Sequence, residues 1–546
     1  MHTRFIQSIL ASILVIPLLQ GQKTDEGRPL RDRQKLARAK SLFNEANYNG
    51  VVYTLEPLLK KWPSHADVNY YAGRANLELK HYGEAFEQLR SVILSGKRKF
   101  RDAPFWYGRV WQQLHEPDSA LAWFNRYKKS LKKFGIDPYD VDYYIRQAER
   151  FKAFREKPVP VKLRKLGPEI NTEFEEACPT INAEGNMLVF TSRRPTTTGG
   201  QRDPFDLKFF QDIYISRRDS LSGRWMEAEP LKAVNTPEHD ANMNISPDGS
   251  LLFIYKNIKG KTGSGDIWVS REKNGEWTKA REWEGPFNTS YFETSAALSP
   301  DGKTLYFISE RPDGKALGNG DIWMCQRISR REWAKPVNLG PQINTPYDEI
   351  SVWMHPNGRT LFFASKGHDS MGGYDIFKTE KKDGQWTPPV NLGYPINTPD
   401  DEIHFTMTAD GKTAYLASRR EADENELNIY ELDLSEYPLV ASEISKDAER
   451  ASTSSGAVLS VIKGQVTGNG MPLAAEVVFL DERTGKEVLR VDTDEDGRYF
   501  ATLEGGRRYK VSVTAEGFRK WEESIYISKK EGPQPFVLQR NFNLQP

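Results

Sequence analysis

The sequence predicts a multidomain protein whose N-terminal third is α-helical and whose remainder is all-β. Three observations carry this prediction: a helical pattern repeats every 34–35 residues, a strand-rich unit recurs five times, and short strands alternate near the C-terminus. The 546 residues are enough for about three or four domains. With 13 Trp, 23 Tyr and 27 Phe, they supply packing material that a disordered chain lacks.

The charges of the whole chain balance. There are 76 Lys and Arg against 75 Asp and Glu, a formal net charge of +1. A balanced chain has no electrostatic footprint for nucleic acid or anionic lipid, so neither is predicted as a partner. The mean hydropathy of −0.65 and a single apolar run near membrane-spanning length exclude a polytopic membrane protein.

Residues 1–21 have the pattern of a secretory signal peptide. Arg4 precedes the apolar run Phe5–Leu19, and the small residue Gly21 follows it. A retained membrane anchor is the alternative, but Pro17 interrupts the helix and the run is shorter than the roughly 20 residues that span a bilayer. We therefore expect export, with cleavage near Gly21. No Cys lies near that point, so we expect no lipid anchor and no direct membrane span.

Two cysteines, Cys178 and Cys325, lie in apolar strand contexts. We predict that both are small buried residues, because two distant cysteines cannot make a disulfide scaffold. The sequence has no CxxC or HExxH pattern, and its eight His are scattered. It therefore predicts no metal and no cofactor.

Residues 28–150 carry the helical repeat. Its landmarks recur 34–35 residues apart: Gly73–Arg74 and Gly108–Arg109, Ala85 and Ala120, Tyr48 and Tyr82. Small residues at fixed helical positions let paired helices approach closely. The pattern resembles about three degenerate tetratricopeptide repeats, which implies partner binding in a concave groove; a structural spacer is the alternative. We interpret the basic tract Lys97–Lys99 with Arg101 as a solvated turn.

Residues 158–438 repeat a unit of about 54 residues with three landmarks in constant order. An Asn-Thr pair enters each unit, at Asn171, Asn235, Asn288, Asn344 and Asn397. A tight turn then joins two apolar strands, at Gly185, Gly249, Gly302, Gly358 and Gly411. An Asp- or Asn-Ile-aromatic segment follows, at Ile213, Ile267, Ile322, Ile376 and Ile429.

A unit of this length with several short strands is typical of a propeller blade, so five copies predict a five-bladed β-propeller. Six blades with one unrecognisable copy is the alternative. The last unit lacks the Trp-x-x-Pro strand, and Pro160–Gly167 resembles the missing part; we predict that this segment completes the last blade and closes the ring. The Ser-Pro-Asp-Gly segments at 246–249 and 299–302 resemble the WD40-like PD40 repeats of TolB-type propellers.

Charged residues that repeat with the unit form the candidate site. An acid stands five residues after each entry Asn: Glu176, Asp240, Glu293, Glu349 and Glu402. A base stands seven to nine residues after each turn Gly: Arg193, Lys256, Arg311, Lys366 and Arg419. Antiparallel pairing predicts that the two sets face each other near one mouth of the central channel. We favour ion pairs that hold the blades; a ring that binds a peptide terminus, glycan or cation is the alternative.

Residues 439–460 are predicted as a linker and 461–540 as a small β-sandwich of short alternating strands. The order of these strands resembles the carboxypeptidase regulatory-like domain, which implies a transthyretin-like, non-catalytic module. Asp492–Gly497 matches the start of a calcium loop, but Leu503 stands where the bidentate Glu is needed. We interpret this segment as a turn.

No segment predicts catalysis. The Gly-Lys-Thr sequences at Gly260, Gly302 and Gly411 lack the upstream Gly of a phosphate-binding loop. No Gly-x-Ser-x-Gly elbow is present, and no nucleophile stands out with a base of its own. We therefore predict that the protein is not an enzyme.

The order of signal peptide, helical repeats, PD40 propeller and regulatory-like sandwich resembles the PorE-like, OmpA-family-associated envelope proteins of the Bacteroidota. The resemblance implies a periplasmic scaffold at the outer membrane that docks envelope or type IX-like secretion proteins. Family members also carry a lipid-bearing Cys and an OmpA-like peptidoglycan-binding domain, which this sequence lacks. A separate peptidoglycan-binding or secretion component is therefore among the expected partners. A soluble peptide- or glycan-binding protein that uses the propeller channel is the alternative function.

Overall fold

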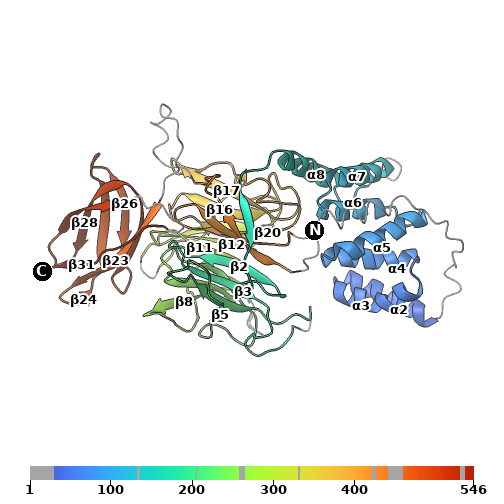
Figure 1. The fold of residues 1–546 in the computed structure, drawn as a ribbon, viewed down its shortest axis with the longest axis horizontal. Coiled ribbons are helices and arrows are strands. Elements are labelled where there is room, and N and C mark those ends of the chain that lie inside the picture. The colour runs from blue at the N-terminus through green and yellow to red at the C-terminus, as the bar shows by residue number, and fades with distance from the viewer. Residues whose placement is uncertain are drawn as a thin grey trace.

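The computed structural model describes residues 30–131, 136–203, 206–256, 265–329, 332–420, 426–440, 459–528 and 535–546. The predicted signal peptide and most of the predicted linker lie outside these residues. Helices, sheets and a C-terminal sandwich follow one another along the long axis of the molecule, so the structure is of mixed α and β type (Figure 1). Within the described ranges, no helix has the length and apolar character needed to cross a membrane.

Seven described helices form an N-terminal helical unit in which each helix packs against the next: α2 (Leu30–Asn44), α3 (Tyr48–Lys61), α4 (Ala66–Glu78), α5 (Tyr82–Ser95), α6 (Ala103–Gln113), α7 (Pro117–Leu131) and α8 (Val141–Glu156). Two of the repeated glycines lie where helices meet. A Cβ on Gly73 would stand 2.8 Å from Leu89, and one on Gly108 would stand 2.7 Å from Phe124. The prediction that small residues allow close helix packing is confirmed.

Five antiparallel sheets follow, each with four main strands. The first contains β2 (Glu176–Ile181), β3 (Met187–Ser192), β4 (Asp212–Arg217) and β5 (Glu229–Pro230), and the second β6 (Asp240–Ile245), β7 (Leu251–Lys256), β8 (Ile267–Lys273) and β10 (Arg281–Glu282), with β9 (Glu276–Trp277) beside β8. The third contains β11 (Glu293–Leu298), β12 (Thr304–Ser309), β13 (Asp321–Gln326) and β14 (Val337–Asn338). The fourth contains β15 (Glu349–Met354), β16 (Thr360–Ser365), β17 (Asp375–Lys382) and β19 (Val390–Asn391), with β18 (Gln385–Trp386) beside β17. The fifth contains β20 (Glu402–Met407), β21 (Thr413–Ser418), β22 (Asn428–Asp433) and β1 (Lys162–Lys165).

The first main strands of these sheets, here called the inner strands, contact one another in a closed order. β2 contacts β6, β6 contacts β11, β11 contacts β15, β15 contacts β20, and β20 contacts β2. Strand β1, which precedes the first sheet in the chain, completes the fifth: Lys162 pairs with Asp433 and Lys165 with Tyr430. The prediction that residues 160–167 complete the last unit is confirmed. The described ranges contain no sixth sheet of this kind.

The repeated landmarks have definite structural roles. All five turn glycines have φ between +68° and +75°, the left-handed conformation that favours Gly in a tight hairpin. Each entry Asn uses its side-chain amide to bind both backbone groups of an Ile in the third strand of the preceding sheet, at 2.8–3.1 Å. These pairs are Asn235–Ile213, Asn288–Ile267, Asn344–Ile322, Asn397–Ile376 and Asn171–Ile429.

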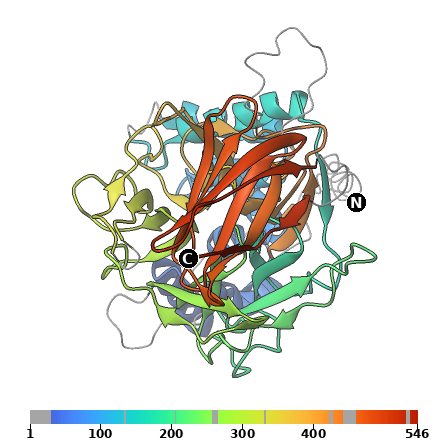
Figure 2. The same ribbon diagram turned by 90° about the vertical axis from the view of Figure 1, so that its left-hand side faces the viewer.

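The C-terminal sandwich consists of two sheets around one apolar core. One sheet contains β23 (Leu459–Gly468), β24 (Met471–Pro472), β27 (Arg498–Glu504), β30 (Val537–Gln539) and β31 (Phe542–Leu544), and the other contains β25 (Ala475–Asp481), β26 (Glu487–Asp492), β28 (Arg507–Ala515) and β29 (Trp521–Ile527). Val466 and Tyr499 of the first sheet pack against Val477 and Val511 of the second. Viewed along the long axis, the sandwich lies in front of the five sheets, which surround it in projection (Figure 2).

Candidate functional site

The five predicted acids occupy the first position of the five inner strands, and all five residues are completely buried. Each carboxylate accepts hydrogen bonds from the backbone N–H and the hydroxyl of the Thr four residues earlier: Thr172, Thr236, Thr289, Thr345 and Thr398. In four sheets it also accepts from the Ser that ends the second strand: Ser192, Ser309, Ser365 and Ser418. The acids therefore hold the segment that precedes each inner strand in place, and they do not face solvent.

Two of the five predicted bases face their acid. Lys256 Nζ lies 2.5 Å from Asp240, and Arg311 Nη2 lies 3.5 Å from Glu293. The other three expected pairings are wrong. The structure instead places Arg193 on Asp206, Lys366 over the ring of Tyr374, and Arg419 at 3.9 Å from Glu175.

A shift of one residue explains two of the three wrong pairings. Neighbouring side chains of an extended segment point to opposite sides, so the next residue after Arg193 and Arg419 reaches the acid. Arg194 lies 3.2 Å from Glu176, and Arg420 lies 3.4 Å from Glu402. In the first, third and fifth sheets the paired Arg stands two residues after the Ser that binds the same carboxylate. Counting from that Ser would have identified the bases from the sequence.

The fourth sheet has Gly367 at the corresponding position, and no described Lys or Arg forms an ion pair with Glu349. Burial raises the pKa of Glu349 to about 8, although Thr345 and Ser365 donate to its carboxylate. Burial also raises the pKa of Glu402, but only to about 7, because Arg420 acts in the opposite direction. Each acid binds groups of its own repeat unit, so the geometry favours the interpretation that the acids hold each sheet together.

A thiol and an imidazole meet between the first and fifth sheets. Cys178 Sγ lies 3.2 Å from His404 Nε2, and each residue stands at a bulge with φ above +50°. Burial raises the pKa of Cys178 to about 12 and lowers the pKa of His404 to about 4. Both groups are therefore neutral at pH 7, unlike the thiolate–imidazolium pair of an activated nucleophile.

The prediction that both cysteines are small buried residues is confirmed for Cys325, which is fully buried and donates to the carbonyl oxygen of Ala334. It is only partly right for Cys178, which is half-buried and paired with His404. The sequence contains one indication that Cys178 and His404 lie close together. Cys178 and His404 both stand two residues after a repeated acid, which places them at equivalent points of neighbouring inner strands.

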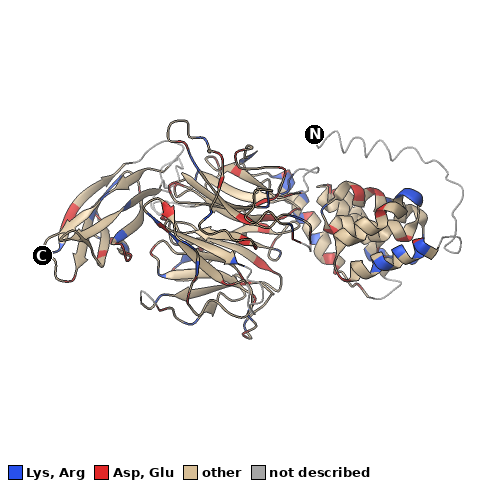
Figure 3. Ribbon diagram, turned by 90° about the horizontal axis from the view of Figure 1, so that it is seen from below, with Lys and Arg blue, Asp and Glu red and all other residues tan. Residues whose placement is uncertain are grey.

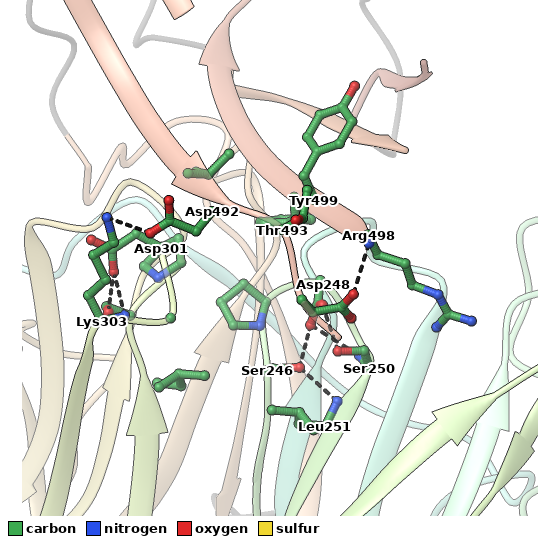
Figure 4. A pocket seen from close by; sticks show the side chains of 18 of the residues that line it. Ser246, Asp248, Ser250, Leu251, Asp301, Lys303, Asp492, Thr493, Arg498 and Tyr499 are labelled. Carbon is green, nitrogen blue, oxygen red and sulfur yellow. Dashed lines mark hydrogen bonds and ion pairs between the residues drawn. The ribbon is translucent and has the colours of Figure 1, made fainter. Parts of the chain in front are cut away.

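A cleft of about 500 Å³ lies between the C-terminal sandwich and the hairpin turns of the second and third sheets (Figure 4). The Ser-Pro-Asp-Gly turns line its sheet side, and in each turn the Ser hydroxyl donates to the Asp two residues later. Because these polar groups satisfy one another, the motif residues shape the turns. On the sandwich side, the Asp494 carboxylate accepts the N–H groups of Asp496 and Arg498, which is the turn chemistry predicted for this segment.

The sandwich is attached to the sheets by polar and apolar contacts. Lys303 forms an ion pair with Asp492 across the cleft at 2.9 Å (Figure 4). An apolar cluster joins Val461 and Phe500 of the sandwich to Ala183 and Ala409, the residues two positions after the ends of β2 and β20. The sandwich therefore covers this end of at least two inner strands.

The helical unit contains a second cleft, of about 520 Å³. We call it the helical groove; it is lined by residues of α2, α4 and α7 and by the segments that precede α6 and α8. Asp102 fixes its aromatic wall: one carboxylate oxygen accepts from Tyr70 at 2.6 Å, Trp106 at 3.0 Å and Tyr139 at 2.7 Å. Lys99 stands at its edge, 2.6 Å from the buried Asp67.

The helical unit is attached to the fourth and fifth sheets through buried polar contacts. The hydroxyl of Tyr82 binds Asp400 at 2.8 Å, and Lys80 forms an ion pair with Asp401 at 3.0 Å. Gln147, which is fully buried on α8, donates to the carbonyl oxygen of Gly372 at 2.6 Å. Both ends of the sheet assembly are thus joined to another part of the chain, and no sequence pattern announced these contacts.

Comparisons with known proteins identify no family. No protein-family model and no curated protein matches the chain. The solved structures that resemble it include an α-L-arabinofuranosidase from Lactobacillus brevis, at 14% identity and TM-score 0.31 over 51% of this chain and 94% of that chain. A glycoside hydrolase gives 12% identity and TM-score 0.33 over 55% and 97%, and the RRP9 WD40 repeats give 11% and 0.27 over 50% and 97%. With every one of these TM-scores below 0.5, the likenesses carry no argument about activity.

Proposed function

We propose that the chain is a non-enzymatic scaffold of the cell envelope, in which the five sheets form a closed five-bladed β-propeller between a tetratricopeptide-like helical unit and a regulatory-like sandwich. The closed order of inner-strand contacts and the five Asn–Ile pairs support this architecture. Following the resemblance in the sequence, the chain is exported to the periplasm. Partner proteins hold it at the outer membrane, among them components of a type IX-like secretion machinery.

The helical groove is the observation that carries this proposal. It combines a cavity of about 520 Å³ with an aromatic wall held in place by Asp102, and Lys40 and Arg101 also line it. Rigid aromatic side chains bind partner segments at low entropic cost, and basic side chains at the edge provide orientation. Because buried contacts join the helical unit to the sheets, a partner bound in the groove is fixed relative to the whole chain.

The charge of the helical unit supports docking of an acidic segment. Residues 30–156 contain 24 Lys and Arg against 15 Asp and Glu, an excess that the balance of the whole chain conceals. Figure 3 shows several of these basic residues at the end of the helical unit that points away from the sheets. A surface of one sign raises the rate of encounter with a partner of the opposite sign.

The environment of the buried titratable groups supports a role without catalysis. The inner-strand acids are saturated with hydrogen bonds, and the Cys178–His404 pair is neutral because burial raises the pKa of the thiol and lowers the pKa of the imidazole. Neither arrangement supplies an activated nucleophile or an accessible general base.

The test is purification of the tagged full-length chain from detergent-solubilised envelopes, compared with a groove variant that carries Lys99→Glu and Arg101→Glu. We expect stable partners with the native chain and a loss of about tenfold in their recovery with the variant. Lys60→Glu, on the exposed end of α3, is the matched control and should leave recovery unchanged. A native chain recovered alone contradicts the proposal, and so does turnover of a hydrolase substrate that one point mutation abolishes.

A further inference from the structure

The two residues that precede each inner-strand acid occupy corresponding positions in the five sheets. These positions lie at the end of the sheets that contacts the helical unit. They are Phe174–Glu175, Glu238–His239, Tyr291–Phe292, Tyr347–Asp348 and Asp400–Asp401. In the fifth sheet the helical unit covers this point, where Asp400 binds Tyr82 and Asp401 binds Lys80. In the fifth sheet, therefore, a helical surface with a Lys and a Tyr binds the acids at this position.

The third and fourth sheets expose apolar side chains at the same point. Tyr291 is 45% exposed, Phe292 43% and Tyr347 39%, and the nearby Leu317 is 40% exposed. The segment after Leu317 packs on the fourth sheet, because a Cβ on Gly318 would stand 2.1 Å from the carbonyl oxygen of Tyr347. These four residues, with Glu310 and Asp348, are here called the aromatic rim. Contiguous exposed apolar residues with polar neighbours are typical of protein interaction sites.

The two charges of the aromatic rim are both negative. The backbone N–H of Glu310 donates to the carbonyl oxygen of Phe292 at 3.1 Å, which places this exposed acid beside the aromatic residues. Burial and the charge of Asp348 raise the pKa of Glu310. In the described part of the chain, no Lys or Arg forms an ion pair with Glu310 or Asp348.

We infer that the aromatic rim binds a helical segment of a partner protein that presents Lys or Arg. Asp348 of the fourth sheet is the equivalent of Asp401 of the fifth, where Lys80 from the turn between α4 and α5 supplies the cation. A Lys or Arg placed at the rim would meet two carboxylates and the faces of Tyr291 and Phe292, which attract cations through their π electrons.

Continuity with an existing interface supports a protein as the occupant. Tyr347 stacks on Tyr143 of α8, with ring centroids 4.9 Å apart and an interplanar angle of 21°, so the aromatic rim begins where the helical unit ends. A partner helix laid on the rim would extend this interface. The negative charge of the rim opposes anionic lipid and nucleic acid, which leaves a basic protein segment as the matching ligand.

This inference rests on the proposed scaffold function and is tested in the same envelopes. The full-length chain carries a photo-cross-linking amino acid in place of Tyr291, and the cross-linked peptide is sequenced. We expect a protein adduct whose peptide has an excess of Lys and Arg, and a loss of yield of about tenfold with Glu310→Lys. Glu238→Lys makes the same charge change in the second sheet, at the position that corresponds to Tyr291, and is the matched control; it should change the yield less than about twofold.

Each other result has a definite meaning. An acidic peptide, a lipid adduct, a second copy of this chain, or equal losses with Glu310→Lys and Glu238→Lys would overturn the inference. Unchanged thermal unfolding of Glu310→Lys shows that the variant folds, and Phe292→Ser is a second variant that leaves the charge unaltered. If the native chain is recovered without partners, the scaffold proposal fails; if partners survive Glu310→Lys but not the groove variant, only the aromatic rim is wrong.

Discussion

Asn171 and Ile429 stand 258 residues apart, yet the amide of Asn171 accepts the N–H of Ile429 at 2.8 Å and donates to its carbonyl oxygen at 2.9 Å. In each of the remaining four sheets, the corresponding Asn binds the Ile of the preceding sheet, and the two residues are only 21 or 22 positions apart in the sequence. The first sheet is therefore joined to the last by the chemistry that joins sequential neighbours. The Asn171 amide also donates to the carbonyl oxygen of Leu166, just after β1, so one side chain anchors the strand that completes the fifth sheet.

Asn171→Ala should destabilise the chain by about 1–3 kcal/mol, because it leaves the buried N–H of Ile429 without its partner and such a group costs about that much. The carbonyl oxygen of Ile429 keeps the N–H of Leu166 as a donor. Urea unfolding measures the loss. Asn344→Ala removes the same pair between the third and fourth sheets and is the control. Asn171, unlike Asn344, also binds the segment that follows β1, so Asn171→Ala should expose residues 157–167 to protease more than Asn344→Ala does. Equal cleavage of the two variants would contradict this role.

The repeats made much of this arrangement predictable. Three landmarks in constant order, and the incomplete last unit, were enough to predict that Pro160–Gly167 completes it, because strand pairing follows from backbone chemistry that the landmarks report. The side-chain pairing within the ring was harder. Arg193 and Arg419 were assigned to the acids when Arg194 and Arg420 bind them, because a one-residue error in an extended segment turns a side chain to the opposite side.

Glu349 should make stability depend on pH. Burial raises its pKa to about 8 in the folded chain, above the ordinary value of about 4.5. The folded state therefore holds a proton that the unfolded state releases, so the contribution of Glu349 to stability is fully present below about pH 4.5 and is lost as the pH rises through about 8. Between these pH values, Glu349 should lower the free energy of unfolding by at most about 1.4 kcal/mol per pH unit, and Glu349→Gln should remove this dependence. Urea unfolding at several pH values measures it.

Glu293→Gln is the control for Glu349→Gln, because Glu293 has the same Thr and Ser donors but also faces Arg311. Removing its charge leaves a buried guanidinium without its ion-pair partner, so we expect a loss of about 3–5 kcal/mol at neutral pH. Glu349→Gln should cost far less at the same pH. Equal losses would show that a cation neutralises Glu349 after all.

Neither cysteine should react with iodoacetamide in the native chain at pH 8. Burial raises the pKa of Cys178 to about 12 and the pKa of Cys325 to about 11, so almost no thiolate is present, and the thiolate is the reactive form. Mass spectrometry should detect two modified residues only after unfolding in guanidinium. Rapid labelling of Cys178 alone, lost in His404→Ala, would show that the imidazole activates the thiol and would reopen the question of catalysis.

The attachment of the helical unit lay beyond sequence reasoning for a physical reason. The contacts join Tyr82 of one repeat to Asp400 of another, and nothing in either repeat constrains the two to meet. Hydrophobic periodicity reports which face of an element is buried, but not which element of a distant domain covers it. The cluster of basic residues in 30–156 was visible in the sequence and was missed because the charge was summed over the whole chain.

Asp400→Ala should loosen the helical unit from the sheets without unfolding either part. Its two carboxylate oxygens bind the Tyr82 hydroxyl at 2.8 Å and His115 Nε2 at 3.0 Å, and all three groups lie at the buried interface. Burial and the charge of Asp400 raise the pKa of Tyr82, which keeps its hydroxyl protonated and able to donate. Hydrogen exchange should accelerate by about tenfold or more in the segments around residues 82 and 115, as expected when a buried hydrogen bond worth about 1.5–3 kcal/mol is lost.

Asp369→Ala removes an exposed partner of Arg150 from the same interface and should leave exchange nearly unchanged, since exposed ion pairs contribute about 0–1 kcal/mol. Equal acceleration in the two variants would mean that the apolar contacts, and not the buried polar contacts at Asp400, hold the helical unit in place.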